Sequence, residues 1–192
     1  MLKIISGKFQ NQKIPIAKNI KYRPSTGKLK EAIFSILTSG EFIGDKLFNE
    51  NIKVLDLFAG SGSLAFESLS RGAGFATLID IDLYSLKIAE EFAKTLNIHN
   101  KVNLVNINAL NLPKANTAFD LVFVDPPYHN KIVTKVMKLL IKNNWLNADA
   151  IIVVEMAKTD DYVLDENIEI IREKLYGNTK LLVLKYIHYL VS

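Results

Sequence analysis

The sequence predicts an α/β fold with a mostly parallel, doubly wound sheet of seven strands and an antiparallel strand at the C-terminus. From residue 52 onward, short apolar segments alternate with helical stretches, which is typical of βαβ units whose parallel strands are covered on both faces. Two further strands, at about 167–176 and 180–191, are joined by YGNT and indicate an antiparallel hairpin. The length of 192 residues suits a single core.

The elements after residue 52 follow from apolar periodicity and from the turn residues that flank each segment. The other expected strands are 53–59, 75–80, 101–107, 119–125 and 150–156, and the expected helices lie near 63–71, 83–95 and 131–143. An earlier helix, capped by Ser25 or Thr26, is predicted by the helical spacing of Leu29, Ala32, Ile33, Ile36 and Leu37. We expect residues 46–192 to form the α/β domain.

Residues 1–45 are expected to form a basic extension, made of a β-hairpin within residues 2–18 and the helix that follows it. Residues 1–30 hold eight Lys or Arg and no acid, whereas the rest of the chain holds 16 basic and 20 acidic residues. A basic block on a mildly acidic body is typical of a surface that binds a polyanion such as RNA. An ordinary solvated lysine-rich surface gives the same pattern.

Composition excludes several classes of site. The chain has no cysteine, and its three histidines, His99, His129 and His188, are scattered without metal-ligand spacing, so no disulfide and no metal site is expected. No apolar run reaches the roughly 18–20 residues that span a bilayer, and Lys3 and Lys8 interrupt the start of the chain. We therefore expect a cytoplasmic protein without a membrane anchor.

The segment DLFAGSGSLAFE predicts a cofactor-binding turn between a strand and a helix. Gly60 and Gly62 permit positive φ and close approach of a ligand to an electropositive helix start, and with Ala65 they satisfy G-x-G-x-x-A. A tight turn without a ligand would also explain the glycines. Asp56, inside the preceding strand, favours a cationic ligand because a buried carboxylate needs a donor or cation. S-adenosylmethionine offers both an ammonium and a sulfonium.

The segment LVFVDPPYHN ends a buried strand with a carboxylate and two prolines. Each proline biases the residue before it towards extended geometry, so Asp125 and Pro126 are held stiffly just past the strand. In a doubly wound sheet this fourth strand ends beside the first, which brings both motifs to one crevice. There the Asp125 carboxylate and the Pro126 carbonyl would accept hydrogen bonds from N–H groups of a ligand, and Tyr128 would stack on its base.

Three motifs in this order, DLFAGSG, LIDID and DPPY, are similar to those of class I S-adenosylmethionine-dependent methyltransferases that modify amino groups. With KIISGKFQNQKI, RPSTGKLKEAIFSIL, LDLFAGSGSLAFESLSRGA and NNWL, the chain resembles the RsmD family of small-subunit ribosomal RNA guanine-N2 methyltransferases over almost its whole length. The resemblance implies a Rossmann-like fold and a substrate that is 16S ribosomal RNA or the assembling small subunit. Gly27 departs from the family, which usually has an acidic residue there.

The candidate site residues fall into three groups. The catalytic candidates are Asp125, Pro126 and Tyr128. The cofactor candidates are Asp56, Phe58, Gly60 and Gly62, then Asp80 or Asp82 for the ribose, and Asn108 and Ala109, which the resemblance places near the adenine. The RNA-contact candidates are Lys8, Lys13, Arg23, Lys28 and Lys30. Phe58 and Trp145 also suit core packing, His129 suits a surface position, and a monomer is expected.

Three other functions fit the sequence. A DNA adenine methyltransferase is one, since DPPY suits either amine, although 192 residues leave little room for the separate target-recognition region such enzymes usually carry. An amino-methyltransferase of another RNA would use the same motifs. The non-enzymatic alternative is a basic RNA-binding module with an inactive methyltransferase fold, against which the intact acids and glycines argue.

Overall fold

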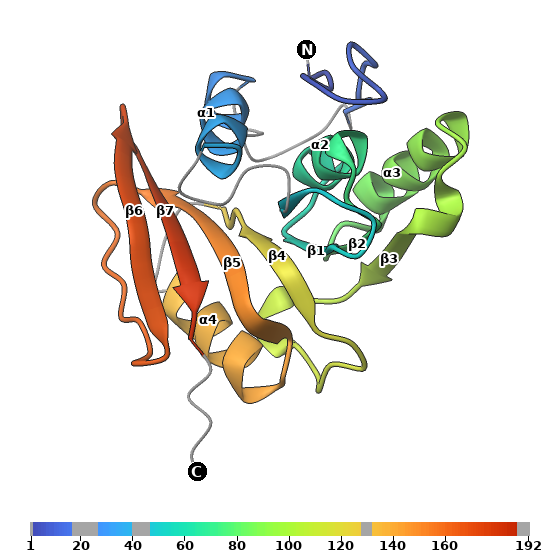
Figure 1. The fold of residues 1–192 in the computed structure, drawn as a ribbon. Coiled ribbons are helices and arrows are strands. Elements are labelled where there is room, and N and C mark those ends of the chain that lie inside the picture. The colour runs from blue at the N-terminus through green and yellow to red at the C-terminus, as the bar shows by residue number, and fades with distance from the viewer. Residues whose placement is uncertain (1, 17–26, 40–46, 128–131, 188–192) are drawn as a thin grey trace.

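The computed structural model describes residues 2–16, 27–39, 47–127 and 132–187 (Figure 1). Its centre is a seven-stranded sheet in the order β3-β2-β1-β4-β5-β7-β6. The strands are β1 (Lys53–Leu57), β2 (Phe75–Asp80), β3 (Val102–Asn106), β4 (Phe119–Val124), β5 (Leu146–Ala157), β6 (Ile168–Tyr176) and β7 (Thr179–Tyr186). The first five strands run parallel, and β7 pairs antiparallel with both β5 and β6. The predicted fold class is confirmed.

Helices cover both faces of this sheet. They are α1 (Gly27–Leu37), α2 (Ser63–Arg71), α3 (Leu83–Thr95) and α4 (Ile132–Lys142), with short 3₁₀ turns η3 (His99–Lys101) and η4 (Ala109–Asn111). Helices α1, α2 and α3 share one core cluster with every second strand residue, and α4 packs in a second cluster on the opposite face (Figure 1). This alternation follows from the two-residue period of side chains along a strand.

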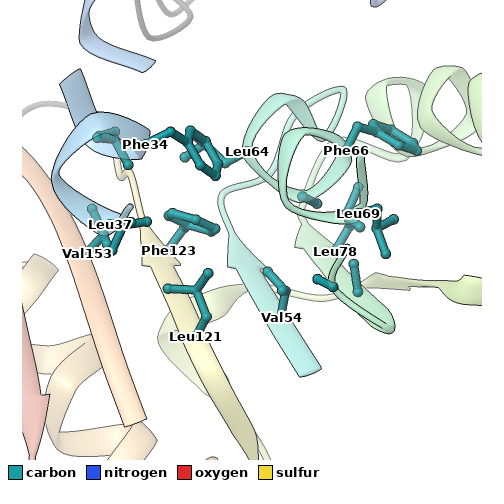
Figure 2. Packing of buried hydrophobic residues seen from close by; sticks show 14 of the residues in the cluster. Phe34, Leu37, Val54, Leu64, Phe66, Leu69, Leu78, Leu121, Phe123 and Val153 are labelled. Atoms are coloured by element: carbon teal, nitrogen blue, oxygen red, sulfur yellow. The ribbon is translucent and has the colours of Figure 1, made fainter. Parts of the chain in front are cut away.

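Helix α1 belongs to the same core as the sheet. Figure 2 shows Phe34 and Leu37 of α1 lying against Phe123 of β4 and Val153 of β5. The rings of Phe34 and Phe123 are 5.9 Å apart, and Phe34 is fully buried. Burial of one such side chain stabilises a fold by roughly 1.5–3 kcal/mol. The N-terminal extension is therefore anchored beside the carboxyl half of β4, where the DPP segment begins.

The expected N-terminal strands are not formed in residues 2–16. This segment folds back on itself with a single antiparallel bridge between Lys3 and Lys13. Around this bridge, the Ile4 amide donates to the Gln12 carbonyl and the Ile14 amide donates to the Leu2 carbonyl. The pairing stops there because the next amides, of Ile5 and Ser6, donate to Glu67 of α2. The predicted hairpin is thus present only as a short antiparallel pairing within a segment, residues 2–16, that we call the N-terminal loop and that docks on α2.

Other details of the prediction agree with the structure. Helices α2 and α3 have the predicted bounds, and the C-terminal hairpin forms, with its second strand inserted between β5 and β6. Trp145 is a core residue, stacked on Phe119 with its Nε1–H donating to the Pro113 carbonyl. Within the described residues, no helix is long and apolar enough to span a bilayer.

Candidate active site

The ends of β1 and β4 lie next to each other at the carboxyl edge of the sheet. Leu57, the last residue of β1, pairs with Val124, the last residue of β4, and with Ile79 of β2. Phe58 and Asp125 therefore leave the sheet side by side. The strand order reverses between β1 and β4, which is where open α/β sheets bind ligands. The register confirms the expectation that the glycine turn and the DPP segment share one edge.

The turn after β1 is built from residues with left-handed backbones. Phe58, Gly60 and Gly62 have φ of 61°, 53° and 79°. Phe58 is the unusual member, because a side chain with Cβ rarely adopts positive φ. Its ring packs against the core cluster on the α4 face, which compensates this conformation. The turn is thus held in one shape before any ligand binds.

Gly62 is required by packing. A Cβ added there would lie 2.4 Å from Cδ2 of Leu78 and 2.9 Å from Cε2 of Phe66. The sequence interpretation assigned this glycine to close approach of a ligand. In the structure, its missing side chain also lets the start of α2 press against β2.

Asp56 is a buried carboxylate with few partners. It is 2% exposed, and its Oδ2 accepts one hydrogen bond, of 3.1 Å, from the amide of Ala65 in α2. Burial raises the pKa of Asp56 to about 7, the amide of Ala65 opposes the shift, and the negative charge of Asp80 adds to it. No cation forms an ion pair with Asp56 in the part of the chain that the structure describes. The position is suited to a positively charged ligand.

Asp80 and Asp82 have different partners. Asp80, at the end of β2, accepts from the Gly60 amide at 2.7 Å and from the Asp82 amide at 2.8 Å. Asp82 caps α3, where its carboxylate accepts from the amides of Tyr84 and Ser85. Asp80 thus contacts the glycine turn directly, whereas the two backbone amides that donate to Asp82 come from its own helix.

Three smaller positions complete the edge near the turn. Asn108 caps η4, where its side chain accepts from the Leu110 amide at 2.8 Å, and Ala109 is buried. Ser63, the first residue of α2, has a buried Oγ without a hydrogen-bond partner among the described residues. Sequence reasoning missed Ser63, because a serine at a helix start is common whether or not a ligand is bound.

The candidate catalytic residues follow β4 directly. Asp125 is half-buried and Pro126 is buried, one and two residues beyond the end of the strand. Tyr128 and His129 lie outside the described residues. Among the residues that the structure does describe, no three His, Cys, Asp or Glu side chains are grouped to hold a metal ion.

The structure contradicts one predicted RNA contact. Lys30 is 1% exposed, its Nζ donates to the Lys3 carbonyl at 2.6 Å, and it lies 3.5 Å from a carboxylate oxygen of Glu67. Burial lowers the pKa of the Lys30 ammonium, and the Glu67 charge opposes this shift. Lys30 is therefore a core residue. Of the other candidates, Lys8, Lys13 and Lys28 are exposed, and Arg23 lies outside the described residues.

Glu67 is the centre of a polar cluster that sequence reasoning did not identify. It is fully buried on α2, and its carboxylate accepts from the amides of Ile5 and Ser6 at 2.7 and 3.1 Å. It also accepts from Nε of Arg71 at 2.9 Å and pairs with Lys30. Glu67 therefore fastens the N-terminal loop and α1 to α2.

Ser70 extends this attachment by one helical turn. Its Oγ donates to the Ser6 carbonyl at 2.6 Å and accepts from the Phe9 amide at 2.9 Å, and its own carbonyl accepts from the Lys8 amide. Gly7 allows this close approach, since an added Cβ would lie 1.9 Å from the Ser70 carbonyl oxygen. The same helix thus carries the glycine turn at its start and the N-terminal loop near its end.

Comparison with known proteins assigns the chain to a family. The family model described as "Conserved hypothetical protein 95" matches residues 2–185. The ribosomal RNA small subunit methyltransferase D of Escherichia coli K12 is 35% identical over 92% of this chain and 85% of its own length. The chain belongs to the RsmD family of methyltransferases. The family predicted from sequence is confirmed.

Three further proteins are similar to the chain over most of their length. An uncharacterized methylase of Rickettsia prowazekii is 64% identical, covering 97% of this chain and 98% of its own. A solved methyltransferase structure from Escherichia coli superposes with a TM-score of 0.84 at 29% identity, covering 98% and 99% of the two chains. An RNA methyltransferase from Salinibacter ruber, solved with S-adenosyl-L-homocysteine, shares the fold with a TM-score of 0.64 at 14% identity, covering 88% and 96%.

Gly27, where the RsmD family usually has an acidic residue, begins α1. A Cβ added there meets no atom within 4 Å. The structure therefore leaves room for a side chain at this position, and nothing in the packing requires the glycine.

Proposed function

We propose that this RsmD-family protein transfers a methyl group from S-adenosylmethionine to the exocyclic N2 amino group of a guanine in small-subunit ribosomal RNA. The observation that carries the proposal is the pairing of Leu57 with Val124, because it sets the glycine turn beside the DPP segment. Family membership supports a methyltransferase, and the strand-end crevice supports a nucleoside-containing cofactor.

The residues around the glycine turn fit S-adenosylmethionine. This cofactor agrees with the family and with the fold. Asp56 is a buried carboxylate that would gain a counter-ion from the ammonium of the methionine part. Asp80 is the better of the two ribose candidates, because it already contacts the turn at Gly60. The unpartnered Oγ of Ser63 would donate to the cofactor at the positive start of α2. Asn108 and Ala109 would lie near the adenine.

The chemistry at the DPP segment is one of positioning. When bound, S-adenosylmethionine supplies a methyl group made electrophilic by its sulfonium. A guanine amino group is a poor nucleophile because its lone pair is delocalised into the ring. The Asp125 carboxylate and the Pro126 carbonyl would each accept a hydrogen bond from one N–H group of this amine and so turn its lone pair towards the methyl group. Tyr128 would stack on the base.

The exposed lysines of the N-terminal extension, residues 1–45, are proposed to bind the RNA. Lys8, Lys13 and Lys28 are available for phosphate contacts, and we retain Arg23 as a candidate. A loop base is presented to the pocket at lower cost than a base inside a helix. A base in a loop of the ribosomal RNA, free or in the assembling subunit, is therefore favoured over a base-paired one, and we expect the protein to act as a monomer.

The test is a methyl-transfer assay with labelled S-adenosylmethionine and three acceptors: deproteinised small-subunit ribosomal RNA, small ribosomal subunits and duplex DNA. We expect label on RNA as N2-methylguanosine. Asp125→Ala should reduce transfer by about 100-fold or more while cofactor affinity stays within several-fold. Asp149→Ala, an exposed aspartate paired with Lys185, serves as the control and should change neither. Label on DNA alone, or equal loss of transfer and cofactor binding in Asp125→Ala, would contradict the proposal.

A further inference from the structure

Helix α4 presents a second basic surface, separate from the N-terminal extension. Lys135, Lys138 and Lys142 are all exposed, and the helix contains no acidic residue. The helix buries Val136 and Leu140 in the core. At about 100° per residue, the three lysines fall within an arc of about 60° on the opposite side of the helix from that core, and they extend about 10 Å along its axis. They form one continuous lysine face.

The charges of this lysine face form no ion pair with acids among the described residues. On α3, by contrast, Lys94 lies 3.1 Å from Glu90 and 2.9 Å from Glu91. No lysine of the α4 face takes part in an ion pair within the described ranges. Lysines spaced three and four residues apart repel each other and slightly destabilise a helix. Repulsion between these lysines therefore lowers the stability of α4 slightly, and a bound polyanion would remove this repulsion.

The segments next to α4 extend this basic surface at one end of the helix and limit it on one flank. At its C-terminal end, the loop that carries exposed Lys114 is fastened to the helix, since the Ala115 amide donates to the Asn143 carbonyl at 2.9 Å. On one flank, the acidic segment after β5 reaches the helix where the Val163 amide donates to Oγ1 of Thr134. The basic surface thus continues past the end of the helix and is limited on that flank.

The position of α4 relates its lysines to the methyl-transfer edge. The helix begins at Ile132, seven residues after Asp125, and runs back along the sheet. It covers the face of the sheet opposite to α1 and α2, to which the N-terminal loop is attached (Figure 1). An RNA strand that enters the crevice at the carboxyl edge would meet the N-terminal lysines on one side and α4 on the other.

We propose that the lysine face of α4 binds phosphates of the RNA strand that flanks the methylated nucleotide. The inference rests on the proposed function, because it concerns how the same substrate is held. Phosphate contacts by lysine are independent of base sequence. Because they release counter-ions, the log of the RNA affinity falls linearly with the log of the salt concentration. Lys135 is the nearest of the three to the crevice along the chain, and Lys142 is the farthest.

The experiment compares two triple variants that lose the same charge. The first is Lys135→Gln, Lys138→Gln and Lys142→Gln, and the control is Lys87→Gln, Lys158→Gln and Lys174→Gln, three exposed lysines on separate elements. Binding to deproteinised small-subunit ribosomal RNA is measured from low to high salt, together with thermal unfolding. The α4 variant should reduce the slope of log affinity against log salt by about 2 to 3, while its melting temperature is unchanged or raised. The control should reduce the slope by less than 1.

Equal slopes for the two variants would overturn the α4 proposal. Methyl transfer by the unmodified protein is measured with the same RNA, so that the two proposals fail separately. Normal methyl transfer by the unmodified protein together with equal slopes would contradict only the proposed role of α4. If no methyl group is transferred to this RNA but the two variants still differ in slope, only the proposed reaction is contradicted.

Discussion

Two buried carboxylates, Asp56 on β1 and Glu67 on α2, differ in how completely they are paired. Glu67 accepts two backbone amides from the N-terminal loop and pairs with Arg71 and Lys30. Asp56 accepts a single amide, from Ala65, and has the negative charge of Asp80 nearby. Both are almost completely inaccessible to solvent. The difference separates a carboxylate that attaches one part of the fold to another from one that we propose binds the cofactor.

The physical reason is the cost of burying a charge. A buried carboxylate is stable when donors and cations surround it, and it becomes protonated when they do not. Glu67 has its full set of partners, so its role is to attach the N-terminal loop and α1 to α2. Asp56 has a raised pKa of about 7, so it would change charge when a cationic cofactor binds. Helix α2 joins the two, since its first turn contacts Asp56 and its next turn carries Glu67.

The largest expected effect is on stability when Glu67 is removed. Glu67→Leu leaves the buried Lys30 ammonium without its anionic partner and two part-buried backbone amides without their acceptor. Loss of one partner of a buried pair should lower the free energy of unfolding by about 3–5 kcal/mol, as measured by urea denaturation. The control is Glu91→Leu on α3, whose pair with Lys94 is exposed and should contribute at most about 1 kcal/mol. Equal losses in both variants would show that the Glu67 cluster is not structural.

The next effect is the pH dependence of stability at Asp56. Its folded-state pKa of about 7 lies above the ordinary value of 3.8. Folding therefore favours the protonated form, and this contribution is complete below about pH 4 and is lost as the pH rises through 7. Asp56→Asn stays neutral throughout. Its free energy of unfolding should match that of the unmodified protein near pH 4 and exceed it by up to about 4 kcal/mol above pH 7. A constant difference over this range would refute the raised pKa.

A smaller effect tests whether Lys30 and Glu67 act as a pair. Lys30→Met removes the ammonium that Glu67→Leu would leave unpaired, so the double variant should be more stable than the sum of the single losses predicts. We expect a coupling of about 1–3 kcal/mol from a double-mutant cycle in urea. Additive losses would mean that Glu67 is held mainly by its backbone donors.

The sequence predicted those parts of the fold that depend on local patterns. Helix α3 follows from apolar periodicity over residues 83–95, and the adjacency of β1 and β4 follows from the general winding of α/β sheets. These features place the glycine turn and Asp125 at one edge without any knowledge of long-range contacts.

The parts that could not be predicted depend on contacts distant in sequence. Lys30 looked like part of a basic arm, and its burial depends on Glu67, 37 residues away. In the N-terminal loop, the amides of Ile5 and Ser6 donate to Glu67, 62 and 61 residues away, which limits the expected hairpin to a single antiparallel bridge. The insertion of β7 between β5 and β6 likewise has no local signal.

The most direct test of the contrast between the two carboxylates is calorimetric titration of S-adenosylmethionine at pH 6.5, in two buffers with different ionisation enthalpies. Binding to the unmodified protein should release up to about one proton, because the ammonium of the cofactor favours ionised Asp56. Asp56→Asn should release none and bind about 10- to 100-fold more weakly, whereas Glu67→Leu, below its unfolding temperature, should bind within several-fold of the unmodified protein. Proton release that persists in Asp56→Asn, or unchanged affinity in that variant, would contradict the account.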